Sequence, residues 1–163
     1  MKTGIFYGST TGTTADVASR IANALNVAES DVHDVASVRP STIADYDFVI
    51  FGSSTWGDGD LQEDWGDFID AVQSMSLAGK KVAIFGCGDE TMSNTFCNAV
   101  GKIYDAVKET GAEIVGAFNT FPYQFDHSDA VKVEGAGAVG LLLDEVNHAD
   151  ATDKRIADWI KTF

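Results

Sequence analysis

The stretch STTGTT, from Ser9 to Thr14, decides how this chain folds, because it joins a strand pattern to a helix pattern. It follows the apolar run GIFYG at residues 4–8 and leads into a segment with helical spacing of apolar residues. A turn from strand to helix points backbone N–H groups and the positive end of a helix dipole at one spot. The stretch therefore predicts a βα unit whose turn binds an anion.

The side chains of this turn indicate which anion it binds. The turn carries five hydroxyls and neither Lys nor Arg, which favours a phosphate held by neutral donors. A single capping Thr is the simpler interpretation, but a helix cap needs only one hydroxyl. A triphosphatase loop, GxxxxGK[ST], is excluded because Thr13 stands where that motif has Lys. The phosphate-binding residues predicted here are Ser9, Thr10, Thr11, Gly12, Thr13 and Thr14.

A second glycine motif, GAGAVG at residues 135–140, has the GxGxxG pattern of dinucleotide-binding domains. That pattern requires a following helix, a second strand and an acidic residue about twenty positions further on. The residues between Gly140 and Phe163 are too few to form such a unit. We therefore interpret these glycines as loop and close-packing positions.

Short apolar strands alternate with helical patterns along the chain. The expected strands are residues 2–7, 32–35, 48–53, 81–86 and 113–118. Apolar residues at helical spacing predict helices around residues 17–25, 96–107 and 152–160, the last capped by Thr152, while Trp65 and Phe68 are expected in the core. This pattern predicts a single α/β domain over residues 1–163, with a doubly wound, five-stranded parallel sheet between two layers of helices.

Ligands of doubly wound sheets bind beyond the carboxyl ends of the strands, which selects the loops at residues 9–14, 54–61 and 87–95. Trp56 lies among small residues in the middle loop, so it is better explained as a stacking wall than as core. Gly86 and Gly88 in GCGDETMSNTF allow close approach of a planar group. A phosphate at the first loop and a flat aromatic group at the others describe a mononucleotide.

Four segments resemble the long-chain group of the flavodoxin family, over essentially the whole chain. They are STTGTT, TWGDG at 55–59, GCGD at 86–89 and GLLLDEVNHADATDKRIADWIK at 140–161. The resemblance implies a flavodoxin-like fold whose fifth strand is interrupted by an insertion at residues 119–139 and resumes at 140–143. It also implies noncovalently bound FMN and a low-potential one-electron carrier that shuttles electrons between a reductase and acceptor enzymes.

The resemblance also implies a cofactor-binding role for individual residues. It puts Ser9 to Thr14 on the phosphate and Trp56 against one face of the isoalloxazine. Met92 stands where the family usually has a Tyr on the second face, and Val146 stands where an acidic residue is common. The resemblance places Ser54, Thr55, Gly57, Asp58 and Gly59 around the ribityl chain and ring. It places Cys87, Gly88 and Asp89 at the pyrimidine edge by backbone contacts, and Thr95 completes the expected set.

Two other classes of protein compete with this interpretation. An FMN-dependent reductase would need room for nicotinamide or quinone over the flavin, and Trp56 should obstruct that face. A phosphorelay receiver domain needs acidic residues at the first strand end and a phosphoacceptor Asp at the third. Those ends here are Tyr7, Gly8 and Ser9, and then Ser53 and Ser54, which excludes the receiver. We expect an electron-transfer protein and no enzyme.

The formal net charge of −14 restricts the partners. Such a field repels nucleic acid and anionic membranes and favours basic protein surfaces. The resemblance implies a flavodoxin or ferredoxin reductase as a partner of this kind. The acidic residues cluster at Asp58, Asp60, Glu63, Asp64, Asp67 and Asp70, with Asp89 and Glu90 at another loop. Cys87 and Cys97 form neither a CxxC nor a metal-ligand pattern, and no metal site is expected. We expect a cytoplasmic monomer with free thiols.

Overall fold

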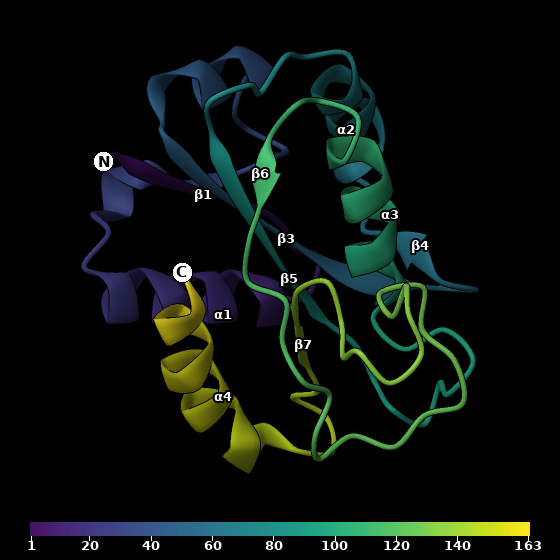
Figure 1. The fold of residues 1–163 in the computed structure, drawn as a ribbon. Coiled ribbons are helices and arrows are strands. Elements are labelled where there is room, and N and C mark those ends of the chain that lie inside the picture. Colours follow the sequence, from purple (N-terminus) through teal and green to yellow (C-terminus); the bar gives the residue numbers. More distant parts are fainter.

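The computed structural model describes residues 1–163 and is built around one sheet (Figure 1). The strands pair in the order β2-β1-β3-β5-β6, with β4 on β3 and β7 on β5. Their bounds are β1 Thr3–Gly8, β2 Val32–Asp34, β3 Phe48–Trp56, β4 Asp60–Leu61, β5 Lys81–Cys87, β6 Glu113–Ile114 and β7 Leu141–Leu143. Every pairing is parallel except that of β3 with β4. The predicted doubly wound sheet is confirmed.

The fifth strand position is shared by β6 and β7. Glu113 of β6 pairs with Lys81 at the start of β5, and Leu143 of β7 pairs with Cys87 at its end. The chain between them leaves the sheet, which confirms the insertion. The expected strand at 113–118 was too long, because Gly116 takes a φ of 85° and its carbonyl accepts the Trp159 indole N–H at 2.7 Å.

Two layers of helices cover the sheet. The α-helices are α1 Thr13–Leu25, α2 Trp65–Gln73, α3 Asn98–Val107 and α4 Thr152–Trp159, and the short 3-10 helices are Glu29–Asp31, Pro40–Asp45, Ala149–Ala151 and Ile160–Thr162. Helix α1 packs beside α4 on one face, and α2 packs beside α3 on the other (Figure 1). None of the helices combines the length and the apolar character needed to cross a membrane.

Side chains of successive strand residues alternate between the two faces, as a pleated strand requires. In β1, Phe6 joins the core under α2 and α3, while Ile5 joins the core under α1 and α4. Trp65 and Phe68 of α2 are buried in the first of these cores, as predicted.

Helix α4 begins differently from the prediction. Thr152 already has helical backbone angles, with a φ of −63°, because the 3-10 turn Ala149–Ala151 runs directly into the helix. Its hydroxyl bonds the Glu145 carboxylate at 2.9 Å and caps no backbone N–H. The predicted Thr152 cap was therefore wrong.

The insertion is held to the body of the protein by the buried side chain of Arg155. Its guanidinium donates to the carbonyl oxygens of Leu142 and Asn119, at 3.0 and 2.9 Å, and to that of Phe121. It also lies 4.7 Å from the centre of the Tyr123 ring. One side chain of α4 thus binds both β7 and the first part of the insertion.

The glycines of GAGAVG have the two roles that the sequence predicts. Gly135 and Gly137 adopt positive φ angles of 82° and 78° in the loop. At Gly140 an added Cβ would lie 2.2 Å from the carbonyl oxygen of Ile84, so that position requires close packing.

Candidate cofactor site

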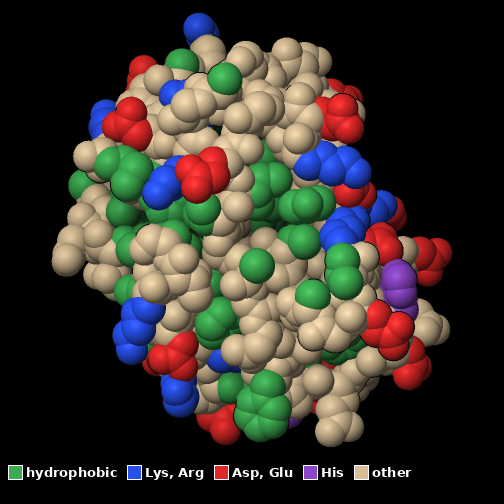
Figure 2. Space-filling model, in the orientation of Figure 1, with side chains coloured by type: hydrophobic (Ala, Val, Ile, Leu, Met, Phe, Trp, Pro, Cys, Tyr) green, Lys and Arg blue, Asp and Glu red, His purple; other side chains and the backbone are tan.

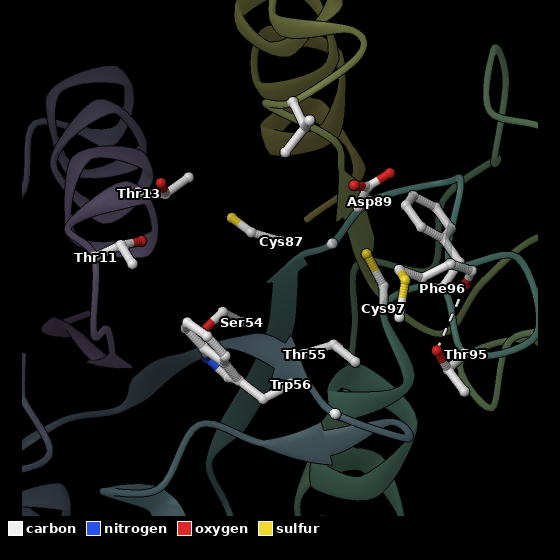
Figure 3. Close-up of a pocket in the computed structure, with 14 residues that line it drawn as sticks. Thr11, Thr13, Ser54, Thr55, Trp56, Cys87, Asp89, Thr95, Phe96 and Cys97 are labelled. Atoms are coloured by element: carbon white, nitrogen blue, oxygen red, sulfur yellow. Dashed lines mark hydrogen bonds between the residues drawn. The ribbon is translucent and has the colours of Figure 1, made fainter.

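Three loops at the carboxyl ends of β1, β3 and β5 surround a pocket of about 300 Å³. Figure 3 shows Thr11 and Thr13 at one side of the hollow, Trp56 below it and Asp89 with Phe96 at the opposite side. Its lining residues are Thr11, Thr13, Ser54, Thr55, Trp56, Gly57, Cys87, Gly88, Asp89, Met92, Thr95, Phe96, Cys97 and Val146. Most of the residues predicted for the site therefore meet in one place.

The hydroxyls of the first loop differ in what they bond. Ser9 Oγ accepts the amide N–H of Gly12 at 3.1 Å, and Thr10 Oγ1 accepts from Gln62 Nε2 at 3.0 Å. Thr10 lines a neighbouring hollow with Trp56. Thr14 Oγ1 is buried and has no hydrogen-bond partner. The protein thus uses two of these hydroxyls itself and leaves a buried one unbonded.

Backbone N–H groups accompany these hydroxyls. Gly12 has a φ of 95° and directly precedes α1, whose first residue is Thr13. The first amides of a helix have no intrahelical acceptor, and they carry its positive dipole end. An added Cβ at Gly12 would touch nothing within 4 Å, so this backbone is open to an approaching group. Neutral donors converge here, as an anion requires.

The middle loop is a hairpin, because β3 continues to Trp56 and pairs antiparallel with β4. The strand predicted at 48–53 was therefore too short, and β4 was missed. The amide of Gly59 donates to the carbonyl of Trp56 at 3.0 Å and closes the turn. Gly59 is buried, with a φ of 102°, and an added Cβ would lie 2.5 Å from Asn98 Nδ2. Asp58 is exposed at the tip and, like Gly59, does not line the pocket.

Trp56 presents its indole at the edge of the pocket. Its side chain is 42% exposed, and its Nε1–H donates to Ser54 Oγ at 2.7 Å. Thr55 lies deeper, where its Oγ1 accepts the amide N–H of Ala99 at 3.1 Å. An exposed indole with a held orientation is suited to stack on a planar ligand.

The third loop supplies a thiol, a carboxylate and a thioether. Burial raises the pKa of Cys87 to about 12, so its thiol stays protonated and neutral. The Thr91 hydroxyl and amide, with Asn147, hold the pKa of Asp89 below its usual range. Met92 lines the pocket and is 54% exposed.

Three lining residues are absent from the predicted set, namely Phe96, Cys97 and Val146. Phe96 follows the helical spacing of buried residues, which indicates core and hides its second role. Val146 comes from the segment after β7. It stands where the family commonly has an acidic residue, and this difference could have identified it as a site residue. Cys97 and Cys87 are both free thiols, and both are buried.

The pocket has no Lys or Arg in its lining, and Asp89 is the one acidic residue of that lining. Figure 2 shows acidic side chains beside Lys and Arg side chains at the edge of the molecule that carries β4, where Lys102 Nζ lies 3.6 Å from Asp60 Oδ1. Within the acidic window at residues 58–70, Asp58, Asp60, Glu63, Asp67 and Asp70 are exposed. Negative charge therefore borders the mouth of the site.

Comparisons with known proteins all point to one family. The family model described as Flavodoxin matches residues 5–159. The chain is 40% identical over 161 residues to a flavodoxin of Buchnera aphidicola, covering 98% of this chain and 94% of the relative. It is 39% identical over 160 residues to Flavodoxin 1 of Escherichia coli strain K12, covering 98% and 90%. A Fusobacterium nucleatum flavodoxin bound to flavin mononucleotide has a similar structure, with a TM-score of 0.88, 29% identity and coverage of 99% and 96%.

Proposed function

The chain belongs to the flavodoxin family, and from that premise we propose that its FMN binds in the pocket between the three loops. The protein is an FMN-based electron carrier and not an enzyme, and it works with redox partner proteins. When bound, FMN supplies a flavin that accepts and donates single electrons. The chain's own residues bind that group, orient it and limit its contact with water.

The observation that carries the proposal is the buried, unpartnered hydroxyl of Thr14. A buried donor without an acceptor costs free energy, and a phosphate oxygen beside the first turn of α1 would satisfy it. Thr11 and Thr13 add hydroxyls on the pocket side. Ser9, Thr10 and Gly12 shape the loop and offer backbone N–H groups. The residues present therefore fit a phosphate monoester held without a cation.

The rest of the pocket suits the flat ring. Trp56 would cover one face and Met92 would approach the other, because both line the pocket and remain partly exposed. The backbone and neutral thiol at Cys87 to Asp89 would meet the polar edge of the ring. Ser54, Thr55, Gly57 and Thr95 would surround the ribityl chain and ring, while Asp58 and Gly59 shape the hairpin.

We further propose how the carrier is used. The exposed acids of the window at 58–70 begin at the cofactor hairpin, so the face that passes electrons would also dock on basic partners, such as a reductase that loads it. The chain would act as one domain over residues 1–163 and as a monomer. Two buried free thiols are consistent with a cytoplasmic location.

Titration of the apoprotein with FMN and with riboflavin tests the cofactor site. The two ligands share the ring and ribityl chain and differ by the phosphate. We expect riboflavin to bind at least about tenfold more weakly, since each charge-assisted hydrogen bond contributes about 1.5 to 3 kcal/mol. Equal affinities would contradict the phosphate role of the loop at residues 9–14.

A further inference from the structure

Glu90 connects three segments that lie far apart in the sequence. One oxygen of its carboxylate bonds His148 Nε2 at 2.7 Å, and the other accepts the amide N–H of Gln124 in the insertion at 2.8 Å. Its own amide N–H donates to Asp144 Oδ2 at 2.9 Å. The Glu90 side chain is only 19% exposed. Both carboxylate oxygens therefore have partners, and neither partner is Lys or Arg.

The insertion makes a second attachment to the same loop. The carbonyl of Ser93 accepts the amide N–H groups of Asp126 and His127, at 2.9 and 2.8 Å. The Ser93 hydroxyl bonds Asp126 Oδ2 at 3.0 Å. The stretch 124–127 of the insertion thus lies along the back of the loop at residues 88–95.

The other side of this loop is a wall of the pocket. Asp89, Met92 and Thr95 line the pocket, whereas Glu90 and Ser93 do not. The loop contains neither helix nor strand, and turns such as the bond from the Met92 amide to the Asp89 carbonyl, at 2.9 Å, are its internal support. A wall with so little regular structure depends on what holds it from behind.

We propose that Glu90 is a positioning residue, whose carboxylate fixes the pocket wall at residues 88–95 against the insertion and against His148. This inference rests on the proposed placement of FMN in the pocket. The insertion then has a defined task in this chain, because it sets where Asp89 and Met92 stand relative to the cofactor. Polar networks of this kind hold a geometry firmly only when every member is bonded, as Glu90 is.

Hydrogen exchange of the apoprotein tests whether Glu90 holds the loop. In Glu90→Ala, we expect the amides of residues 88–95 and 124–127 to exchange at least about tenfold faster than in the wild type. Glu90→Gln should restore slow exchange, because its side-chain amide has the size and shape of the carboxylate and offers a carbonyl to Gln124 and an N–H to the His148 ring. The matched control is Glu134→Ala, which removes an exposed carboxylate of the same insertion. Equal acceleration in β1 and β3 would overturn the proposal, since it would indicate general loss of stability.

The flavin of the loaded protein gives the second readout. Glu90→Ala should weaken FMN binding by about fivefold or more and change the visible circular dichroism of the bound flavin. Glu90→Gln and Glu134→Ala should match the wild type in both measurements. A wild-type spectrum and affinity in Glu90→Ala would overturn the positioning role. If the wild-type protein bound no FMN, the proposed function would fail, and the exchange experiment would still decide whether Glu90 holds the loop.

Discussion

Thr14 differs from the other hydroxyl residues of its loop because its oxygen is buried without a hydrogen-bond partner at bonding distance, beside the Cys87 thiol. Ser9 and Thr10, in contrast, bond within the protein and hold the loop in shape. The hydroxyl that most needs an external acceptor is thus the one at the base of α1. Its removal should affect a ligand with a phosphate more than it affects the fold.

Replacing Thr14 with Val keeps the side chain's shape and removes the hydroxyl. We expect FMN binding to weaken by about 1 to 3 kcal/mol, while riboflavin binding stays within twofold of the wild type. Calorimetric titration of the apoprotein with both ligands measures this difference. An equal loss for both flavins would mean that the hydroxyl does not serve the phosphate.

Met92 offers a test of the second wall of the pocket. Its thioether is apolar and adapts to a neighbouring ring, but it stacks less extensively than an aromatic side chain. Met92→Tyr should strengthen FMN binding severalfold and shift the absorption of the oxidised flavin. The same spectrum and affinity in this variant would place Met92 away from the ring.

Asp89 makes the loop at residues 88–95 sensitive to acid. Because the folded state lowers the pKa of this carboxyl below its ordinary 3.8, its contribution to stability is full above that pH. The contribution is lost as the pH falls through the folded pKa, and it is small because the carboxylate is exposed to solvent. Unfolding midpoints between about pH 2 and 5 should therefore fall less steeply in Asp89→Asn than in the wild type. Parallel acid profiles would contradict this role.

Helix α4 and the insertion depend on each other through Arg155. Arg155→Met would remove the guanidinium and leave carbonyls of Leu142, Asn119 and Phe121 without their donor. We expect the free energy of unfolding to fall by about 2 to 4 kcal/mol, measured in urea. Lys154→Met is the control, because Lys154 makes only an exposed pair with Asp158 and should change stability by less than about 1 kcal/mol. A similar effect of both variants would contradict the anchoring role.

The strands and the anion-binding turn could be predicted because each is determined by residues that are adjacent in the sequence. Apolar runs mark β1, β3 and β5, and the hydroxyls of residues 9–14 mark the turn. The missed features depend on contacts between distant residues. The early end of β6 has no local signal, because it depends on the bond from the Trp159 indole to the carbonyl of Gly116. The orientation of Thr10 has none either, because it depends on the bond from Gln62. Strand β4 was missed because two residues, Asp60 and Leu61, give no alternating pattern.

Exposed acids lie at both ends of the sheet, and one group of them lies at the site. Exposed acids border the pocket at the carboxyl ends of the strands, whereas Glu113 lies at the opposite end, where β6 begins. A field centred near the cofactor should guide a basic partner to the side from which electrons leave.

Association with a basic reductase should therefore slow as salt is added. Between about 0.01 and 0.1 M ionic strength, where the Debye length falls from about 30 to 10 Å, we expect the association rate to fall by about an order of magnitude. Neutralising Asp58 and Glu63 to Asn and Gln should flatten this dependence in stopped-flow measurements. The same change at Glu109 and Glu113 is the matched control and should leave it nearly intact. A rate insensitive to salt would contradict docking through the acidic face.

The insertion that divides the fifth strand position is also a place where the chain could be opened, if its two present ends were joined. The ring of Phe163 lies 5.0 Å from that of Phe48, whose amide bonds the carbonyl of Lys2, so the first and last residues lie near each other (Figure 1). Gly135 lies in the insertion, where an added Cβ would touch nothing within 4 Å. A circular permutant that linked residue 163 to residue 1 and opened at Gly135 would keep every strand beside its present neighbour. We therefore expect such a permutant to form the same sheet from a different starting residue.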